Sequence, residues 1–404
     1  MNLSETRRDL ARIFAAGVAR ADPGRAVTEA LNALDPDVRP DAILALGKAA
    51  VAMTAPALAR FPGVPATVVT NPENAADLPG ATVILGGHPV PDAGSVAGGA
   101  ALLSAAEALG AGMRALVLVS GGGSALAVAP VAGVSARDKA EVSRLLLGAG
   151  LDIRAMNTVR QALSRLKGGG LARAAAPARV EALILSDVVG DDPAIIASGP
   201  TVVPAGGPEV ARDLLAEVGL WDRVPASVRA ALGRPAPPPP PAAGWRLVGS
   251  NRLSVEAMTA AAPDARMDPA PLEGDVAEAA ARVAAVAEVP GTTLWGGETT
   301  VVLRGDGRGG RNQELALRVA MALEGASRPW AFLSGGTDGR DGPTDAAGAI
   351  VDGGTLARVR AAGLDPSAML ARNDSYPALD AAGDLLRTGG TGTNVADLQI
   401  LRVG

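Results

Sequence analysis

The sequence contains no cysteine and only one histidine, His88, among its 404 residues. The absence of cysteine excludes disulfide bonds, thiolate nucleophiles and metal sites built on cysteine ligands. A single histidine cannot form a multi-histidine metal site, and a serine–histidine–aspartate triad would have to use His88 alone. Apart from His88, any catalysis must therefore depend on other side chain types and on backbone groups.

Aromatic residues are also scarce, at 2%, which is too few to form stacking platforms for single-stranded nucleic acid. The formal charge is −5 and no run of Lys or Arg occurs, so we expect no nucleic-acid partner. No apolar run is long enough to predict a membrane-spanning helix, and the charged N-terminal segment does not resemble a signal peptide. We therefore expect a cytoplasmic protein without a membrane partner. Lysine occurs only at Lys48, Lys139 and Lys167, which makes each of them a candidate for a specific role.

Short apolar runs alternate with longer helical segments in the first half of the chain, a pattern that predicts βαβ units and a parallel sheet. Helices are expected at 136–147 and 158–166. The expected strands are 42–46, 66–69, 81–85, 115–119 and 180–185. The second half predicts a further α/β or α+β domain, with a helix at 312–323 and strands at 246–248, 292–294, 299–304, 330–333, 349–351 and 397–403.

A proline-rich stretch near residue 240 interrupts every periodic pattern, and such a stretch acts as a semi-rigid spacer rather than as part of a sheet. We therefore predict an N-terminal domain over 1–234, a linker over 235–244 and a C-terminal domain over 245–404.

A glycine-rich loop, Ser120-Gly121-Gly122-Gly123-Ser124, follows one of the predicted strands. Glycines let backbone N–H groups converge on an anion, and a following helix N-terminus adds partial positive charge. The loop is a candidate phosphate or carboxylate site, although an ordinary tight turn has the same composition. Lys48 follows the first strand at the same sheet edge, where its ammonium could hold a carboxylate or a transferring phosphoryl group.

Carboxylates follow strands in both halves of the chain. Asp187 and Asp191 come after the strand at 180–185, where carboxylates commonly hold Mg²⁺, although aspartate is also an ordinary turn residue. The loop that begins Gly335-Gly336-Thr337-Asp338 is a second candidate for binding phosphate, a cation or a hydroxyl group, with an ordinary surface loop as the alternative.

Residues 305–310 match G-x-G-x-x-G, but the acidic residue expected to bind ribose is missing after the next strand, so a dinucleotide site is not favoured. Arg311, which begins the following helix, could clamp a carboxylate or a phosphate in a bidentate manner. His88 and Ser124 are candidates for contacting the substrate, although a lone histidine is more often structural.

These segments together resemble the type-II glycerate kinase family, whose C-terminal region is the MOFRL domain, and the resemblance covers nearly the whole chain. The matching segments are 46–49, 87–91, 120–126, 157–169, 186–193, 196–201, 310–314, 336–345, 373–376 and 391–395. The resemblance implies two α/β domains that face each other across a cleft, the N-terminal one Rossmann-like with a mostly parallel sheet. It also implies ATP-dependent phosphorylation of D-glycerate, at the 2-hydroxyl, to give 2-phosphoglycerate.

By this resemblance Lys48 and Arg311 are the cations most expected to contact substrate and phosphate. Phosphoryl transfer requires positioning and charge neutralisation and little covalent chemistry, so a chain without cysteine can perform it with Mg²⁺. The residues leave open which carboxylate, Asp187, Asp191 or Asp338, serves as base or metal ligand. They also leave open the oligomeric state, for which a homodimer is one candidate.

Two other functions remain open at this stage. Relatives are often labelled hydroxypyruvate reductase, and an NAD(P)H-dependent reductase would have to use the weak glycine motif at 305–310 together with His88. A protein that binds a carboxylate without turnover is the third hypothesis.

Overall fold

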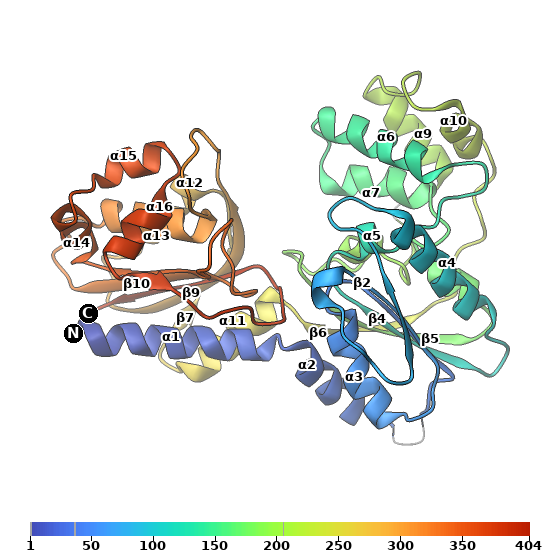
Figure 1. Cartoon of the computed structure of the whole chain (residues 1–404), viewed down its shortest axis with the longest axis horizontal. Coiled ribbons are helices and arrows are strands. Elements are labelled where there is room, and N and C mark those ends of the chain that lie inside the picture. The colour runs from blue at the N-terminus through green and yellow to red at the C-terminus, as the bar shows by residue number, and fades with distance from the viewer. Residues whose placement is uncertain (1, 36–37, 205) are drawn as a thin grey trace. The chain divides into compact units, whose positions relative to one another are not determined.

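The structure is a computed structural model that describes residues 2–35, 38–204 and 206–404. The chain forms two compact units, each with its own sheet (Figure 1). The N-terminal unit is Pro23–Val248, and the C-terminal unit combines Met1–Asp22 with Gly249–Gly404. The predicted α/β class is confirmed for both.

The N-terminal unit contains a six-stranded, all-parallel sheet in the order β3-β2-β1-β4-β5-β6. Its central strands are continuously apolar because helices cover both faces. The strand order reverses direction between β1 and β4, the place where ligands of open α/β sheets bind. The strands are β1 (Ala42–Leu46), β2 (Ala66–Thr70), β3 (Ala81–Leu85), β4 (Arg114–Val119), β5 (Arg179–Leu185) and β6 (Gly244–Gly249).

The helices of this unit have two kinds of surroundings. Those that border the sheet or its loops are α2 (Pro23–Asn32), α3 (Ala50–Arg60), α4 (Ala93–Glu107), α5 (Gly123–Leu126) and α8 (Gly170–Ala175). A separate helical cluster has its own apolar core and consists of α6 (Ala136–Gly148), α7 (Ile153–Ala162), α9 (Pro208–Glu217) and α10 (Ala226–Leu232) (Figure 1). Short 3₁₀ turns lie at Pro72–Asn74 and Ile196–Ser198.

The helix predicted at 158–166 is wrong in its position. Helix α7 begins earlier because the Asp152 side chain accepts a hydrogen bond from the backbone N–H of Ala155 and caps the first turn. It ends at Ala162, and the following residues form a turn in which Gly168 and Gly169 both have positive φ. This turn carries Lys167.

The C-terminal unit contains a mixed sheet in the order β12-β11-β10-β13-β9-β7, with β8 also paired to β9. The pairs from β12 to β9 are antiparallel, whereas β7 and β8 run parallel to β9. The strands are β7 (Arg266–Met267), β8 (Leu272–Asp275), β9 (Gly291–Thr300), β10 (Trp330–Gly336), β11 (Gly348–Asp352), β12 (Leu385–Leu386) and β13 (Asp397–Val403).

The pair of strands predicted at 292–294 and 299–304 is wrong, because β9 is one continuous strand. Glycines lie inside it for a packing reason: a Cβ on Gly297 would lie 2.1 Å from the backbone oxygen of Leu272, in the neighbouring strand β8. The glycines therefore allow two strands to approach closely rather than forming a turn.

Helices cover both faces of this second sheet. Helices α1 (Leu3–Arg20) and α11 (Asn251–Ala261) pack on one face (Figure 1). On that face Leu10, Ile13 and Phe14 meet apolar side chains of β9, β10 and β13. The second apolar core includes residues of the other helices, which are α12 (Val276–Ala285), α13 (Arg311–Ala322), α14 (Thr355–Ala361), α15 (Pro366–Ala371) and α16 (Ser375–Ala381). None of the described helices is both long and apolar enough to cross a membrane.

The two units divide the chain differently from the predicted boundaries at 1–234, 235–244 and 245–404. Helix α1 belongs to the C-terminal unit because its apolar side chains pack on that sheet. The proline-rich stretch contacts the N-terminal unit, where the Arg173 guanidinium donates to the carbonyl of Pro238, 2.7 Å away. Strand β6, expected to begin the second half, is the edge strand of the first sheet.

Candidate functional site

The loops that follow β1 and β4 are hydrogen-bonded to each other at the point where the strand order reverses. The backbone N–H of Lys48 donates to the carbonyl of Gly121, 2.8 Å away. The N–H of Ala49 donates to the Ser120 hydroxyl at 3.1 Å, and the N–H of Ser120 donates to the carbonyl of Leu46 at 3.0 Å. The predicted glycine loop and Lys48 therefore belong to one rigid backbone arrangement.

Four consecutive N–H groups of the glycine loop have no hydrogen-bond acceptor in the part of the chain that the structure describes. They belong to Gly121, Gly122, Gly123 and Ser124. Buried backbone donors are nearly always paired, and Gly121 and Gly123 are buried. Helix α5, which follows, is only one turn long, so its dipole adds less partial positive charge at the loop than we expected from the sequence. The free N–H groups are what makes this loop suitable for an anion.

Glycine at positions 121 and 122 makes room for side chains from three other segments. A Cβ on Gly122, whose φ is 79°, would lie 3.1 Å from Lys48 and 3.2 Å from His88 side-chain atoms. A Cβ on Gly121 would lie 1.9 Å from the Asp187 carboxylate. The structure therefore brings Lys48, His88 and Asp187 to the glycine loop.

The charges at this loop influence one another. Burial raises the pKa of Asp187, while its own backbone N–H and the charge of Lys48 act in the opposite direction. Partial burial and then the charge of Lys48 lower the pKa of His88, against the influence of Glu73. Within the described ranges neither Lys48 nor Asp187 forms an ion pair within 4.0 Å. Both side chains are therefore available to a ligand.

The three carboxylates predicted as Mg²⁺ ligands belong to two different units. Asp187 and Asp191 follow β5 in the N-terminal unit, and Asp191 has a left-handed backbone with φ of 54°. Asp338 follows β10 in the C-terminal unit. Among the residues that the structure describes, no set of three acidic or histidine side chains could hold a metal ion.

Arg311, the other predicted cation, is held by two carboxylates of the C-terminal unit. Its guanidinium forms a bidentate pair with Asp397, at 2.7 and 3.0 Å, and a further contact with Glu298 at 2.7 Å. Burial opposes the charged form of Arg311, but these carboxylates raise its pKa further above the usual range. A guanidinium has five N–H donors, so three of them serve these contacts and two are left for a ligand.

In the segment predicted as a second phosphate loop, the N–H groups of Gly336 and Thr337 are engaged within the protein. Gly335 and Gly336 belong to β10, and the N–H of Gly336 donates to the carbonyl of Ala347 at 2.8 Å. The N–H and the hydroxyl of Thr337 both donate to the carbonyl of Ala396. The Asp338 carboxylate accepts the N–H of Arg340. These contacts stabilise the end of a strand and leave few donors for phosphate.

The glycine motif at 305–310 has a packing role in this structure. A Cβ on Gly305 or Gly307 would lie 2.4–2.7 Å from backbone atoms of Arg372. The N-terminus of the following helix α13 is already occupied, because the Asp341 carboxylate accepts the N–H groups of Asn312 and Gln313. A pyrophosphate would have to displace this carboxylate.

A cavity of about 680 Å³ borders the glycine loop and contains cations that were not predicted as site residues. Lys139 and Lys167 stood out in the sequence only as two of three lysines, and Arg160 lay inside one of the matching segments. The lining of this cavity includes His88, Gly122, Ser124, Lys139, Arg160 and Lys167.

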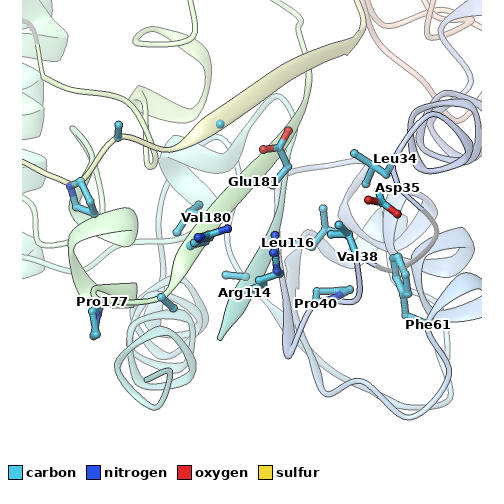
Figure 2. Close-up of a pocket in the computed structure, with 16 residues that line it drawn as sticks. Leu34, Asp35, Val38, Pro40, Phe61, Arg114, Leu116, Pro177, Val180 and Glu181 are labelled. Carbon is cyan, nitrogen blue, oxygen red and sulfur yellow. The ribbon is translucent and has the colours of Figure 1, made fainter. Parts of the chain in front are cut away.

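A second cavity, of about 650 Å³, lies at the opposite, amino-terminal edge of the same sheet (Figure 2). Its lining includes Pro40 before β1, Arg114 at the start of β4 and Pro177 before β5. None of the predicted site residues lines it. Since ligands of open α/β sheets bind at the carboxyl ends of the strands, the glycine-loop edge is the better candidate.

Comparison with known proteins assigns the chain to a family. The description "Domain of unknown function (DUF4147)" matches residues 9–233, and "MOFRL family" matches residues 291–397. An Agrobacterium vitis protein named "Putative hydroxypyruvate reductase" is 42% identical over 422 aligned residues, which cover 98% of this chain and 94% of that protein.

Two further matches come from Thermotoga maritima. Its D-glycerate 2-kinase is 40% identical over 328 residues, which cover 78% of each chain. A crystal structure of glycerate kinase from the same organism has a TM-score of 0.93 and 35% identity, and the match covers 99% of this chain and 100% of that one. The chain therefore belongs to the glycerate kinase family that combines DUF4147 and MOFRL domains.

Proposed function

We propose that this chain is an ATP-dependent D-glycerate 2-kinase, in which Lys48 and the glycine loop hold the phosphoryl group during its transfer. The observation that carries the proposal is the set of four unpaired N–H groups beside the unpaired ammonium of Lys48. Donors aimed at developing negative charge, in a site that needs no reorganisation, are the main source of catalysis in phosphoryl transfer.

Asp187 is the proposed proton acceptor. Burial raises its pKa toward the range in which a carboxylate works as a general base, and its carboxylate lies against the glycine loop. In the proposed step the 2-hydroxyl oxygen of glycerate forms a bond to the γ-phosphorus of ATP. The bond from that phosphorus to the bridging oxygen breaks, ADP leaves, and the hydroxyl proton passes to Asp187.

Mg²⁺ fits this proposal as a companion of the nucleotide. Mg²⁺ is usually bound through one or two carboxylates together with substrate phosphates, so it does not require three protein ligands. Asp187 lies at the glycine loop and would complete such a set only if it is not the base. The ion would neutralise phosphate charge.

Arg311 is proposed as a second cation for the substrate anions. Its pair with Asp397 fixes the plane of the guanidinium, and two N–H groups stay available. His88 and Ser124 are proposed to contact glycerate, since both lie at the glycine loop, where the phosphoryl group would be transferred. A nucleotide contact at Gly335, Gly336, Thr337 or Asp338 stays a prediction. It is the least supported of the proposed contacts, because polar groups of this segment already form hydrogen bonds within the protein.

Reduction of hydroxypyruvate is less well supported. The glycine motif at 305–310 packs on neighbouring backbone, and Asp341 caps the helix that follows it. The deciding assay incubates the protein with D-glycerate and Mg-ATP and, separately, with hydroxypyruvate and NAD(P)H. We expect ADP and 2-phosphoglycerate, distinguished from the 3-phosphate by ³¹P NMR. Oxidation of the nicotinamide without release of ADP would overturn the proposal.

Variants of Lys48 and Asp187 test the assigned roles. Lys48→Met should lower kcat roughly 10²-fold, the usual effect of losing one oriented electrostatic donor. Asp187→Asn should remove the acidic limb of the pH–kcat profile. If that variant instead keeps the profile and raises the Mg²⁺ concentration needed for half-maximal rate, Asp187 is a metal ligand and not the base.

A further inference from the structure

Three cations from different elements line the cavity beside the glycine loop. Lys139 lies on α6, Arg160 on α7, and Lys167 in the turn that follows α7. The charges of Lys139 and Arg160 act on Lys167, and that of Arg160 acts on Lys139, so the three groups are close enough to repel one another. A repulsive cluster of this kind is unfavourable unless something offsets it.

No carboxylate of the described residues neutralises this cluster. The Lys139 ammonium donates to the carbonyl of Leu163 at 3.1 Å, and the Lys167 ammonium donates to the carbonyl of Ser124 at 2.7 Å. Arg160 has no hydrogen-bond or ion-pair partner within the described ranges. Lys139 and Lys167 are only 9% and 5% exposed, and charged side chains are rarely buried without a partner.

The carboxylate that does line the cavity is committed elsewhere. Asp92 caps α4, where it accepts hydrogen bonds from the N–H groups of Ser95 and Gly87, each 2.9 Å away. Two further arginines, Arg137 and Arg144, add positive charge at exposed positions of the lining. Arg144 already pairs with Glu141.

The backbone around Lys167 is held in an unusual conformation. Ala197 and Ser198 have positive φ, at 50° and 60°, which is unfavourable for residues other than glycine. The N–H of Gly168 donates to the carbonyl of Ser198 at 3.0 Å, and the Ser198 hydroxyl lies 2.7 Å from that of Ser124. Strain held in place by a network of this kind is typical of ligand sites.

We propose that this cavity binds the polyphosphate of the nucleotide, with Lys139, Arg160 and Lys167 holding the phosphate oxygens. A chain of phosphates carries enough negative charge to offset three cations, whereas the single carboxylate of a three-carbon acid does not. A volume of about 680 Å³ is also typical of a site for a ligand of nucleotide size. Gly122 and Ser124 line the same cavity, which leads the terminal phosphate to the glycine loop.

Apolar side chains in the lining suit the rest of such a ligand. Val96 and Val128 are among them, and they offer a surface on which a nucleobase can pack. The identity of the polyanion as a kinase substrate rests on the proposed function. The cation site itself rests on the cavity, the missing carboxylate partners and the contacts around Lys167.

The test measures the binding of ADP, inorganic tripolyphosphate and D-glycerate separately, by calorimetry at pH 7, to the wild type and three variants, which are Arg160→Met, Lys139→Met and Arg165→Met. Arg160→Met removes a cation that has no other partner in the described residues. Arg165→Met is the matched control, because Arg165 lies in the same segment, is exposed and pairs with Glu107 outside the cavity. We expect Arg160→Met to weaken ADP and tripolyphosphate at least tenfold and to leave glycerate unchanged, and we expect Arg165→Met to change neither.

The possible outcomes separate this inference from the proposed function. Unchanged ADP affinity in Arg160→Met and Lys139→Met would overturn the inference, even if the wild type phosphorylates glycerate. Loss of glycerate binding with intact ADP binding would overturn it as well, because the three cations would then hold the hydroxy acid. If Arg160→Met binds ADP more weakly and the wild type does not phosphorylate glycerate, the nucleotide site is supported and only the proposed function is contradicted. Melting temperatures confirm that each variant is folded.

Discussion

The backbone N–H of Lys48 donates to the carbonyl of Gly121 across 2.8 Å, although the two residues are separated by more than seventy positions in the sequence. The neighbouring bond from the N–H of Ala49 to the Ser120 hydroxyl strengthens this connection. Together these bonds fix the ammonium and the glycine loop relative to each other. Functional groups held by connected, hydrogen-bonded backbone are positioned more precisely than groups on independent loops.

Ser120→Ala should reduce both stability and catalysis. The change leaves the buried N–H of Ala49 without an acceptor, which costs about 1–3 kcal/mol of unfolding free energy. It also loosens the Lys48 loop, so we expect a fall in kcat larger than any change in KM. Chemical denaturation and steady-state kinetics measure the two effects. Ser254→Ala is the control, because that buried hydroxyl has no partner within the described residues and its removal should be nearly neutral. Equal effects of both changes would contradict the assigned role of Ser120.

Gly122→Ala should impair activity far more than stability. Position 122 has φ of 79°, and a Cβ there would crowd the side chains of Lys48 and His88. The control is Gly150→Ala, since Gly150 has φ of 69° and no atom within 4 Å of a Cβ. Both variants should lose about 1 kcal/mol of stability from the backbone conformation. Only Gly122→Ala should lose activity, and retention of full turnover in this variant would remove the glycine loop from the site.

Arg311→Ala should destabilise the protein as well as lower its activity. Asp397 is fully buried and would lose its bidentate partner, and leaving a buried charge unpaired costs about 3–5 kcal/mol. The double change Arg311→Met with Asp397→Leu should recover much of that stability without recovering turnover. Thermal unfolding and kinetics of the two variants check this. If the double variant regains activity, Arg311 acts only through folding. Glu298→Gln is a mild comparison, because an exposed ion pair contributes about 1 kcal/mol or less.

Lys139→Met should change the pH dependence of stability. Burial, and then the charge of Arg160, lower the pKa of Lys139 from 10.5 to about 7. Between these two pH values the unfolded chain holds a proton that the folded chain lacks, so the stability of the ligand-free protein rises with pH across this window. The other charged or titratable side chains that line the cavity around Lys139 are Lys167, Arg160, Arg137, Arg144, His88 and Asp92.

The variant should flatten this rise in stability, which urea unfolding at pH 7, 8.5 and 10 measures. The same variant should be at least as stable as the wild type near pH 7 while binding ADP more weakly. If the stability of the variant depends on pH as that of the wild type does, Lys139 has the same protonation state in the folded and the unfolded chain, and the prediction is wrong.

The strands of the parallel sheet could be predicted almost residue by residue, because continuous apolar runs between turn residues have few alternatives. β1 and β3 have the predicted bounds, and so does β13 in the second sheet. The glycines inside β9 and β10 misled the prediction, since Gly297 and Gly335 serve close packing rather than turns. Local sequence cannot distinguish these two roles of glycine, because the neighbouring strand or side chain comes from a distant segment.

The candidate site could be predicted in part. The glycine loop, Lys48 and Asp187 follow strands, so strand prediction alone places them at one edge of the sheet. The cluster of Lys139, Arg160 and Lys167 could not be found in this way, because it depends on how α6 and α7 pack on the turn after them. The ion pair between Arg311 and Asp397 could not be predicted from the sequence either, because Asp397 lies on the distant strand β13.

The assignment of α1 to the C-terminal unit has a consequence for how the protein is made. A ribosome releases Leu10, Ile13 and Phe14 long before the strands on which they pack, since the whole of Pro23–Val248 is translated in between. At about 5–20 residues per second this delay is on the order of tens of seconds. During that interval α1 cannot pack on its own sheet, so its apolar side chains are available for a chaperone to bind.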